Sequence, residues 1–100
     1  MQARQPTWQE LLAQGSPALN KQVTAVREAV LVDGALSLKT KTLMTMLCDA
    51  LLAHDQGVTN IARNARAQGA SEAEIAETVA VAFLMGGLPA LVTGANAFKK

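Results

Sequence analysis

Apolar residues recur along the chain with the period of an α-helix, and capping residues and glycines stand where each repeat begins and ends. Leu19, Val23 and Val26 show the spacing, and Pro17 precedes them at a first helical position, where its missing N–H costs nothing. The pattern predicts helices over about 8–14, 17–32, 37–53, 55–67, 75–85 and 90–98. We therefore expect an all-α bundle of five to six helices, forming a single domain over residues 1–100.

Two helix starts carry the spacing of a capping box, in which a hydroxyl and a carboxylate each satisfy a backbone N–H of the first turn. These are Thr7 with Glu10 and Ser71 with Glu74. Gly69 is placed to end a helix in the left-handed conformation, and the Gly-Gly-Leu-Pro segment at 86–89 is expected to break the helical run.

The two C-terminal helices carry almost no charge over residues 76–85 and 90–97. A domain of this length has one small core, which cannot cover both helices on every side. We therefore predict a homo-oligomer in which the C-terminal helices pack against copies of themselves.

Composition excludes several other partners. Nine Lys and Arg against eight Asp and Glu give a net charge of +1, which provides no field to attract nucleic acid or anionic lipid. The first six residues are polar, and no apolar run is expected to reach the roughly 18 residues that span a bilayer, so we expect a cytoplasmic protein without a membrane segment. One cysteine and one histidine leave no intrachain disulfide, and neither a metal site nor a cofactor is predicted.

Three segments carry a resemblance to a known family: LSLKTKTLM at 36–44, AQGASEAEIAE at 67–77 and AFLMGGLPAL at 82–91. Together, with the spacing between the first two, they resemble the carboxymuconolactone decarboxylase / alkylhydroperoxidase D-like family over about residues 30–98. The resemblance implies a helical fold that assembles as trimers or hexamers, with active sites between subunits.

In the peroxidase branch of this family, a glutamate faces a C-x-x-C-x-x-x-H motif, and the chemistry needs both thiols. The gap-free register with this family places Thr42 at the glutamate, His54 and Gly57 at the two cysteines and Ile61 at the histidine. All four positions differ, so dithiol peroxidase chemistry is excluded there. Gln56 and Ile61 stand where the decarboxylase branch has histidines, so that activity is not supported either.

The remaining polar groups suggest a different site. Thr42, Thr45 and Asp49 fall at i, i+3 and i+7 on one stripe of a central helix. We hypothesise that Asp49, His54 and Thr42 line a remnant small-molecule pocket in which Asp49 orients the imidazole. The alternative is that Asp49 and His54 only satisfy backbone groups at a helix junction.

Cys48 lies in the densest apolar stretch, 44–53, and is expected to be buried and unreactive. The sequence thus favours an oligomeric family member with a degenerate redox site, serving as a small-molecule pocket or in a structural role. Two alternatives stay open: an antioxidant peroxidase that uses Cys48 and an external thiol, and a lactone decarboxylase that uses His54 for proton transfer. Whether the protein is an enzyme is left undecided by the sequence.

Overall fold

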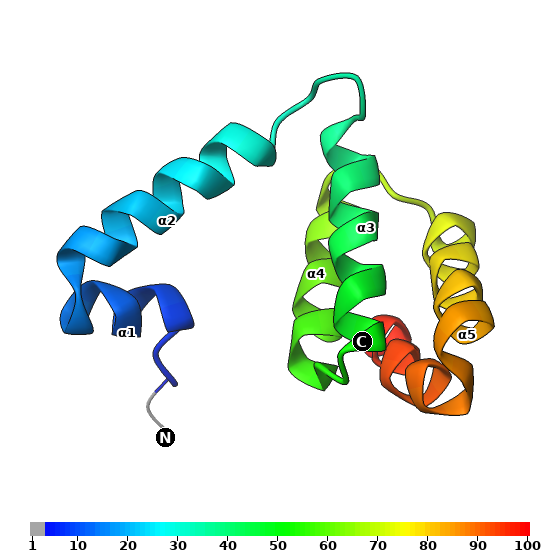
Figure 1. The fold of residues 1–100 in the computed structure, drawn as a ribbon. Helices are drawn as coiled ribbons and strands as arrows, with labels where there is room; N and C mark the ends of the chain where they lie inside the picture. The colour runs from blue at the N-terminus through cyan, green and yellow to red at the C-terminus, as the bar shows by residue number, and fades with distance from the viewer. Residues whose placement is uncertain (1–3) are drawn as a thin grey trace. The chain divides into compact units, whose positions relative to one another are not determined.

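A computed structural model describes residues 4–100 of the chain, and within this range there are helices and no strand. In chain order the helices are α1 (Trp8–Gly15), α2 (Pro17–Val30), α3 (Leu38–Leu51), α4 (Asp55–Ala67), α5 (Glu72–Gly94) and the 3-10 helix η1 (Ala95–Phe98) (Figure 1). The predicted all-α fold of five to six helices is confirmed. The chain divides into two units, Met1–Val32 and Asp33–Lys100. The single domain over residues 1–100 stays a prediction.

The first unit consists of α1 and α2, which pack against each other. The Thr7 hydroxyl caps α1 by accepting the backbone N–H of Glu10 at 3.1 Å. The carboxylate of Glu10 pairs with Arg4 at 2.9 Å. Across the two helices, the Arg27 guanidinium lies 5.3 Å from the centroid of the Trp8 ring, a cation–π contact. Trp8 therefore ties α1 to α2.

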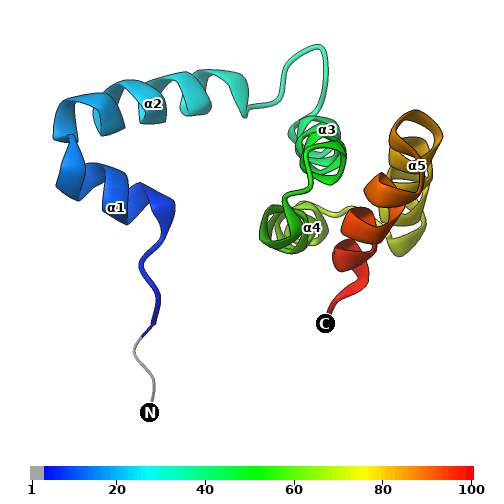
Figure 2. The same ribbon diagram turned by 60° about the horizontal axis from the view of Figure 1, so that its bottom comes forward.

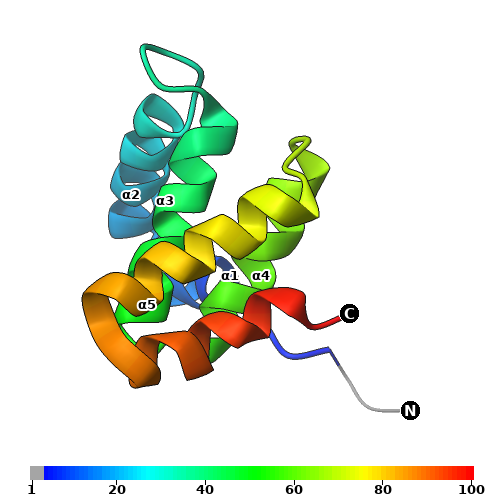
Figure 3. The ribbon, with the colours of Figure 1, turned by 90° about the vertical axis from the view of Figure 1, so that its right-hand side faces the viewer.

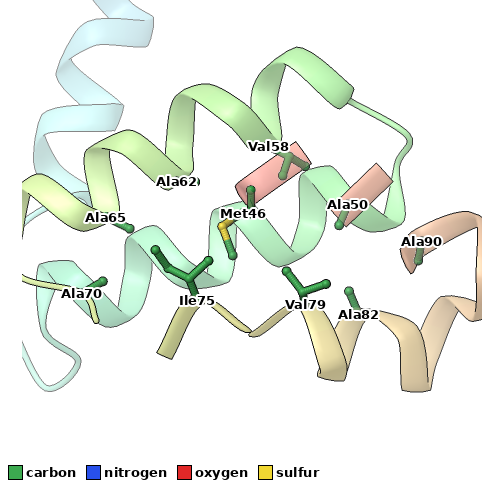
Figure 4. Close-up of a cluster of buried hydrophobic side chains, with 11 residues drawn as sticks. Met46, Ala50, Val58, Ala62, Ala65, Ala70, Ile75, Val79, Ala82 and Ala90 are labelled. Carbon is green, nitrogen blue, oxygen red and sulfur yellow. The ribbon is translucent and has the colours of Figure 1, made fainter. Parts of the chain in front are cut away.

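The second unit is built around α3, which packs against both α4 and α5 (Figure 2). Thr42, Met46 and Ala50 lie one helical turn apart on α3 and are buried. Figure 4 shows Met46, Ile75 and Val79 pointing toward one another at the centre of this core. The core residues are Met46, Ala50, Val58, Ala62, Ala65, Ala70, Ile75, Val79, Ala82, Ala90 and Ala97. The predicted central position of this helix is confirmed within the unit.

The connection from α4 to α5 forms as its sequence predicts. Gly69 takes a φ of 94°, in the region that favours glycine. At the start of α5, the Ser71 hydroxyl accepts the Glu74 N–H at 3.0 Å, and the Glu74 carboxylate accepts the Ser71 N–H at 2.8 Å. This capping box is complete. The Ser71 N–H and the ammonium of Lys39, 2.9 Å away, hold the pKa of Glu74 below its usual range.

Arg66, near the end of α4, joins three elements. Its guanidinium donates to both carboxylate oxygens of Glu72, at 2.7 and 2.9 Å, and to the carbonyl of Ala97 at 2.8 Å. The hydrogen bonds between the two side chains lower the pKa of Glu72 and raise the pKa of Arg66. The pair thus links the end of α4 to the start of α5 and to η1.

Loss of this pair is expected to destabilise the protein in a pH-dependent way. Because folding lowers the pKa of Glu72, its contribution is present above the ordinary value of 4.5 and is lost as the pH falls through the lower folded value. Glu72→Gln should therefore lower the melting temperature at pH 7 by roughly 1–4 °C and have little effect at pH 2. Circular dichroism melts against pH measure this, with Glu77→Gln as the control. A difference that is the same at both pH values would contradict it.

The 86–89 segment interrupts the helical conformation within α5, as predicted. Gly87 has φ 72° and ψ −162° inside a helix that otherwise continues to Gly94. Figure 3 shows the sharp change of direction, after which the C-terminal part runs back beside α4. There η1 meets α4, where the Thr59 hydroxyl donates to the Asn96 carbonyl at 3.2 Å. The predicted break is confirmed, and the predicted last helix corresponds to the part of α5 after Gly87 together with η1.

The expectation that no apolar run is long enough to span a bilayer is wrong, because one segment meets the criteria of length and composition. Glu72–Phe98 comprises 27 residues and contains an 18-residue stretch with a mean hydropathy of 1.9, which suffices for one membrane crossing by length and composition alone. The bend at Gly87 prevents this segment from forming one straight rod. Ile75 and Ala90, on either side of the bend, are both buried against other helices. We therefore treat α5 as a core helix of the second unit.

One face of α5 is left uncovered by the other helices of the second unit. Leu84 and Met85 are 78% and 72% exposed, and the exposed apolar surface continues past the bend to Leu88 and Val92. Solvent exposure of so many neighbouring apolar side chains is uncommon in a monomeric protein. The second unit by itself therefore does not cover the stretch from Ile75 to Phe98.

Candidate functional site

The candidate site is the turn that joins α3 to α4. Ala53 in this turn has φ 63°, a left-handed conformation that costs an alanine roughly 1–2 kcal/mol. The turn is closed by the His54 N–H, which donates to the Asp49 carbonyl at 2.9 Å. His54 is then the N-cap residue of α4, and its side chain makes no capping bond. The strained turn therefore places the imidazole beside the last turn of α3.

The side chains of Asp49 and His54 are bonded to each other. Asp49 Oδ1 lies 2.8 Å from His54 Nδ1, and the side chains of Asp49 and His54 are 20% and 56% exposed. An ionised carboxylate can only accept, so Nδ1 carries the proton in this bond, and the lone pair of the neutral ring is on Nε2. The arrangement can accept a proton at Nε2 and stabilise the resulting cation, the chemistry of a general base.

Gly57, in the first turn of α4, provides the space for this carboxylate. A Cβ on Gly57 would lie 2.5 Å from Asp49 Oδ2 and 2.9 Å from its Cγ. The carboxylate thus lies against the N-terminal turn of α4, where the helix dipole favours a negative charge.

Thr42 is not part of this group. It is buried, and its hydroxyl lies 2.9 Å from the Leu38 carbonyl and 2.7 Å from Oε1 of Gln68. Thr45 instead donates to the Thr42 carbonyl at 2.7 Å. The stripe of Thr42, Thr45 and Asp49 exists on α3, but only Asp49 contacts His54. The interaction of Thr42 with Gln68 holds α3 to the end of α4.

Cys48 is exposed, so the expectation that it is buried is wrong. The buried line of α3 passes through Met46 and Ala50, and Cys48 is two residues from each. Two residues correspond to about 200° around an α-helix, so the thiol lies on the opposite face. Leu51, beside it on this face, is exposed as well. Apolar residues next to Cys48 in the sequence therefore did not indicate that its side chain is buried.

The other places where a ligand could bind are less organised. Within residues 4–100, no group of three His, Cys, Asp or Glu side chains lies close enough to hold a metal ion. The first unit has an open groove of about 310 Å³ that contains none of the predicted site residues. It is lined by Trp8, Gln9, Thr24, Arg27, Glu28 and Leu31.

Ala53 was not singled out by the sequence analysis, and Gly57 entered it only as the position of the family's second cysteine. A left-handed alanine leaves no mark in a sequence, because most residues in that conformation are Gly, Asn or Asp. Gly57 did leave a signal. A glycine in the first turn of a helix is unfavourable unless something approaches the backbone closely, and here that is Asp49.

Comparison with known proteins agrees with the resemblance seen in the sequence. The profile of the Carboxymuconolactone decarboxylase family matches residues 17–100, a longer stretch than the 30–98 predicted. The crystal structure of an apo carboxymuconolactone decarboxylase family protein from Legionella pneumophila is similar, with a TM-score of 0.83 and 27% sequence identity. The similarity covers 89% of this chain and 80% of that one. The comparison with curated proteins gave no significant match.

Proposed function

Because the chain belongs to the carboxymuconolactone decarboxylase family, we propose that it is a non-redox member in which Asp49 and His54 transfer a proton to or from a small molecule. The observation that carries the proposal is the 2.8 Å bond between Asp49 Oδ1 and His54 Nδ1. It leaves the other ring nitrogen of a half-exposed imidazole for a ligand. A pair that served only to satisfy backbone groups would direct its side chains to the backbone instead.

The proton transfer uses the two side chains in different ways. His54 Nε2 takes a proton from an acidic C–H or O–H of the ligand, which becomes an anion. Asp49 keeps the ring oriented and stabilises the imidazolium, which then returns the proton to a carbon or oxygen of the product. These steps suit a lactone decarboxylase, in which carbon dioxide leaves and the carbon that carried it is protonated. Among the alternatives, lactone decarboxylation is the one for which a specific proton-transfer reaction can be named.

A titration followed through the single histidine of the chain tests the proposal. Small lactones and carboxylic acids, including carboxymuconolactone, are added to ¹⁵N-labelled untagged protein. Binding at the site is expected to shift the ring nitrogen signals of His54. Ring signals that stay unchanged across this panel at millimolar concentration would count against a ligand site at His54.

We propose further that the protein is a homo-oligomer, a trimer or hexamer, held together by the exposed face of α5. The support is the apolar surface around Leu84 and Met85, which carries no charged side chain to keep it in water. A neighbouring subunit would then also border the His54 turn, as the family resemblance implies. Covering α5 in this way removes the surface that a membrane would bind, which is consistent with a cytoplasmic location.

The exposure of Cys48 supports a second candidate, a peroxidase that uses this thiol. The thiolate would attack the peroxide to give a sulfenic acid, which an external thiol reduces. Against it, no cationic side chain among residues 4–100 is bonded to Cys48, and a nucleophilic thiolate usually needs one. The proton-transfer proposal is therefore preferred.

A peroxide assay separates these two candidates. We expect no thiol-dependent peroxide consumption above background by the wild type with a dithiol reductant, and no change in Cys48→Ser. The reason is that no cationic side chain is bonded to Cys48 within residues 4–100 to favour its nucleophilic thiolate form. A wild-type rate at least tenfold above background that disappears in Cys48→Ser would support the peroxidase instead.

A further inference from the structure

The first turn of α4 holds a glycine directly against the carboxylate of Asp49. A Cβ at Gly57 would lie 2.5 Å from Asp49 Oδ2, 2.9 Å from its Cγ and 3.3 Å from the Cβ of His54. Two of these separations are far below the 3.5–4.0 Å of favourable van der Waals contact. Any side chain at position 57 therefore excludes Asp49 from its present position.

The group that must give way is the end of a side chain and not the backbone. Asp49 can rotate about its χ angles, so a larger residue at 57 would displace the carboxylate while α3 and α4 stay in place. The rotation would break the 2.8 Å bond to His54 Nδ1. The imidazole would then lose the acceptor that fixes its tautomer.

We propose that Gly57 is a positioning residue, whose missing side chain creates the space in which Asp49 orients His54. Its backbone gives no other reason for glycine, since Gly57 is absent from the positive-φ glycines, which are Gly69 and Gly87. Alanine would also favour the helix more than glycine does. Glycine at position 57 thus favours the Asp49–His54 arrangement at some cost in helix stability. Gly57→Ala should therefore stabilise the fold while it disturbs the orientation of the His54 ring.

The ring nitrogens of His54 report the orientation directly, because the chain has one histidine. In the untagged wild type at pH 8, ¹⁵N spectra should show mainly the tautomer with the proton on Nδ1. Gly57→Ala should reduce that tautomer to the fraction found in Asp49→Ala, with a melting temperature no lower than that of the wild type. Gly15→Ala is the matched control, since a Cβ there meets nothing within 4 Å, and it should leave the tautomer unchanged.

Two results would overturn this role for Gly57: a wild-type tautomer retained in Gly57→Ala, or a wild type without the Nδ1–H tautomer. The positioning role of Gly57 does not depend on the proposed function; only the statement that the oriented imidazole transfers protons rests on it. If the tautomer changes as expected while no small molecule perturbs His54, the proton-transfer proposal fails and the positioning role of Gly57 stands.

Discussion

Replacement of Leu84 by aspartate is expected to convert the proposed oligomer into monomers of 10.5 kDa. Leu84 is the most exposed large apolar residue of α5 within one chain. Burial of a leucine side chain contributes about 1.5–3 kcal/mol, and burial of an unpaired carboxylate costs several more. Since every 1.4 kcal/mol is tenfold, association should weaken by at least about 10³-fold. Light scattering during gel filtration at micromolar concentration measures the mass directly.

Two controls make this result specific. Ala73→Asp adds the same charge to an exposed position in the first turn of α5, eleven residues before Leu84 and beside Glu72 and Glu74, and should keep the wild-type mass. Met85→Lys should dissociate the protein as Leu84→Asp does, and circular dichroism checks that both variants remain helical. A monomeric wild type would contradict the oligomer, and sedimentation of the wild type with lipid vesicles would show that a membrane covers α5 instead.

Substitution of His54 by glutamine should abolish proton transfer at the α3–α4 turn. A positioned acid or base contributes about 10²–10⁴-fold to such a step, so release of carbon dioxide from carboxymuconolactone should fall by at least about 10²-fold. Asp49→Asn should also lower the rate, because an amide does not stabilise the imidazolium as a carboxylate does. The half-exposed position of His54 predicts that the melting temperature changes little.

Glu77→Gln provides the comparison for this experiment. Glu77 is exposed on α5 and is not part of the α3–α4 turn, so its replacement should not alter the rate. A wild type that releases no carbon dioxide would remove the lactone decarboxylase alternative. Equal rates in the wild type and His54→Gln would show that any turnover does not depend on the pair.

Local signals in the sequence were sufficient to predict the helices. Ser16, Ser37 and Ser71 each cap the helix that was expected to follow, and Gly69 takes the left-handed conformation. These features depend on bonds within a few residues, so they can be derived without the tertiary structure. The bend at 86–89 was harder to predict, because glycine and proline show that a helix is disturbed without showing its new direction.

The site was predicted in part, for a related reason. The pairing of Asp49 with His54 follows from their separation of five residues across the end of a helix, and the structure contains it. The predictions for Thr42 and Cys48 depended on which face of α3 is covered, and packing with residues distant in the sequence decides this. Met46 and Ala50 face α4 and α5, so Thr42 is bonded to Gln68 and Cys48 is exposed. Periodicity in the sequence shows which residues share one face of a helix, but it does not show which other element packs against that face.

Seven of the eleven core residues of the second unit are alanine, which has a single methyl group to bury. Each contributes far less transfer free energy than a leucine or phenylalanine, so the interior of one subunit supplies a small margin against unfolding. If neighbouring subunits cover α5, their binding energy becomes part of the free energy of folding. Dilution would then act on this protein as a mild denaturant, and its abundance in the cell would help to set the fraction that is folded.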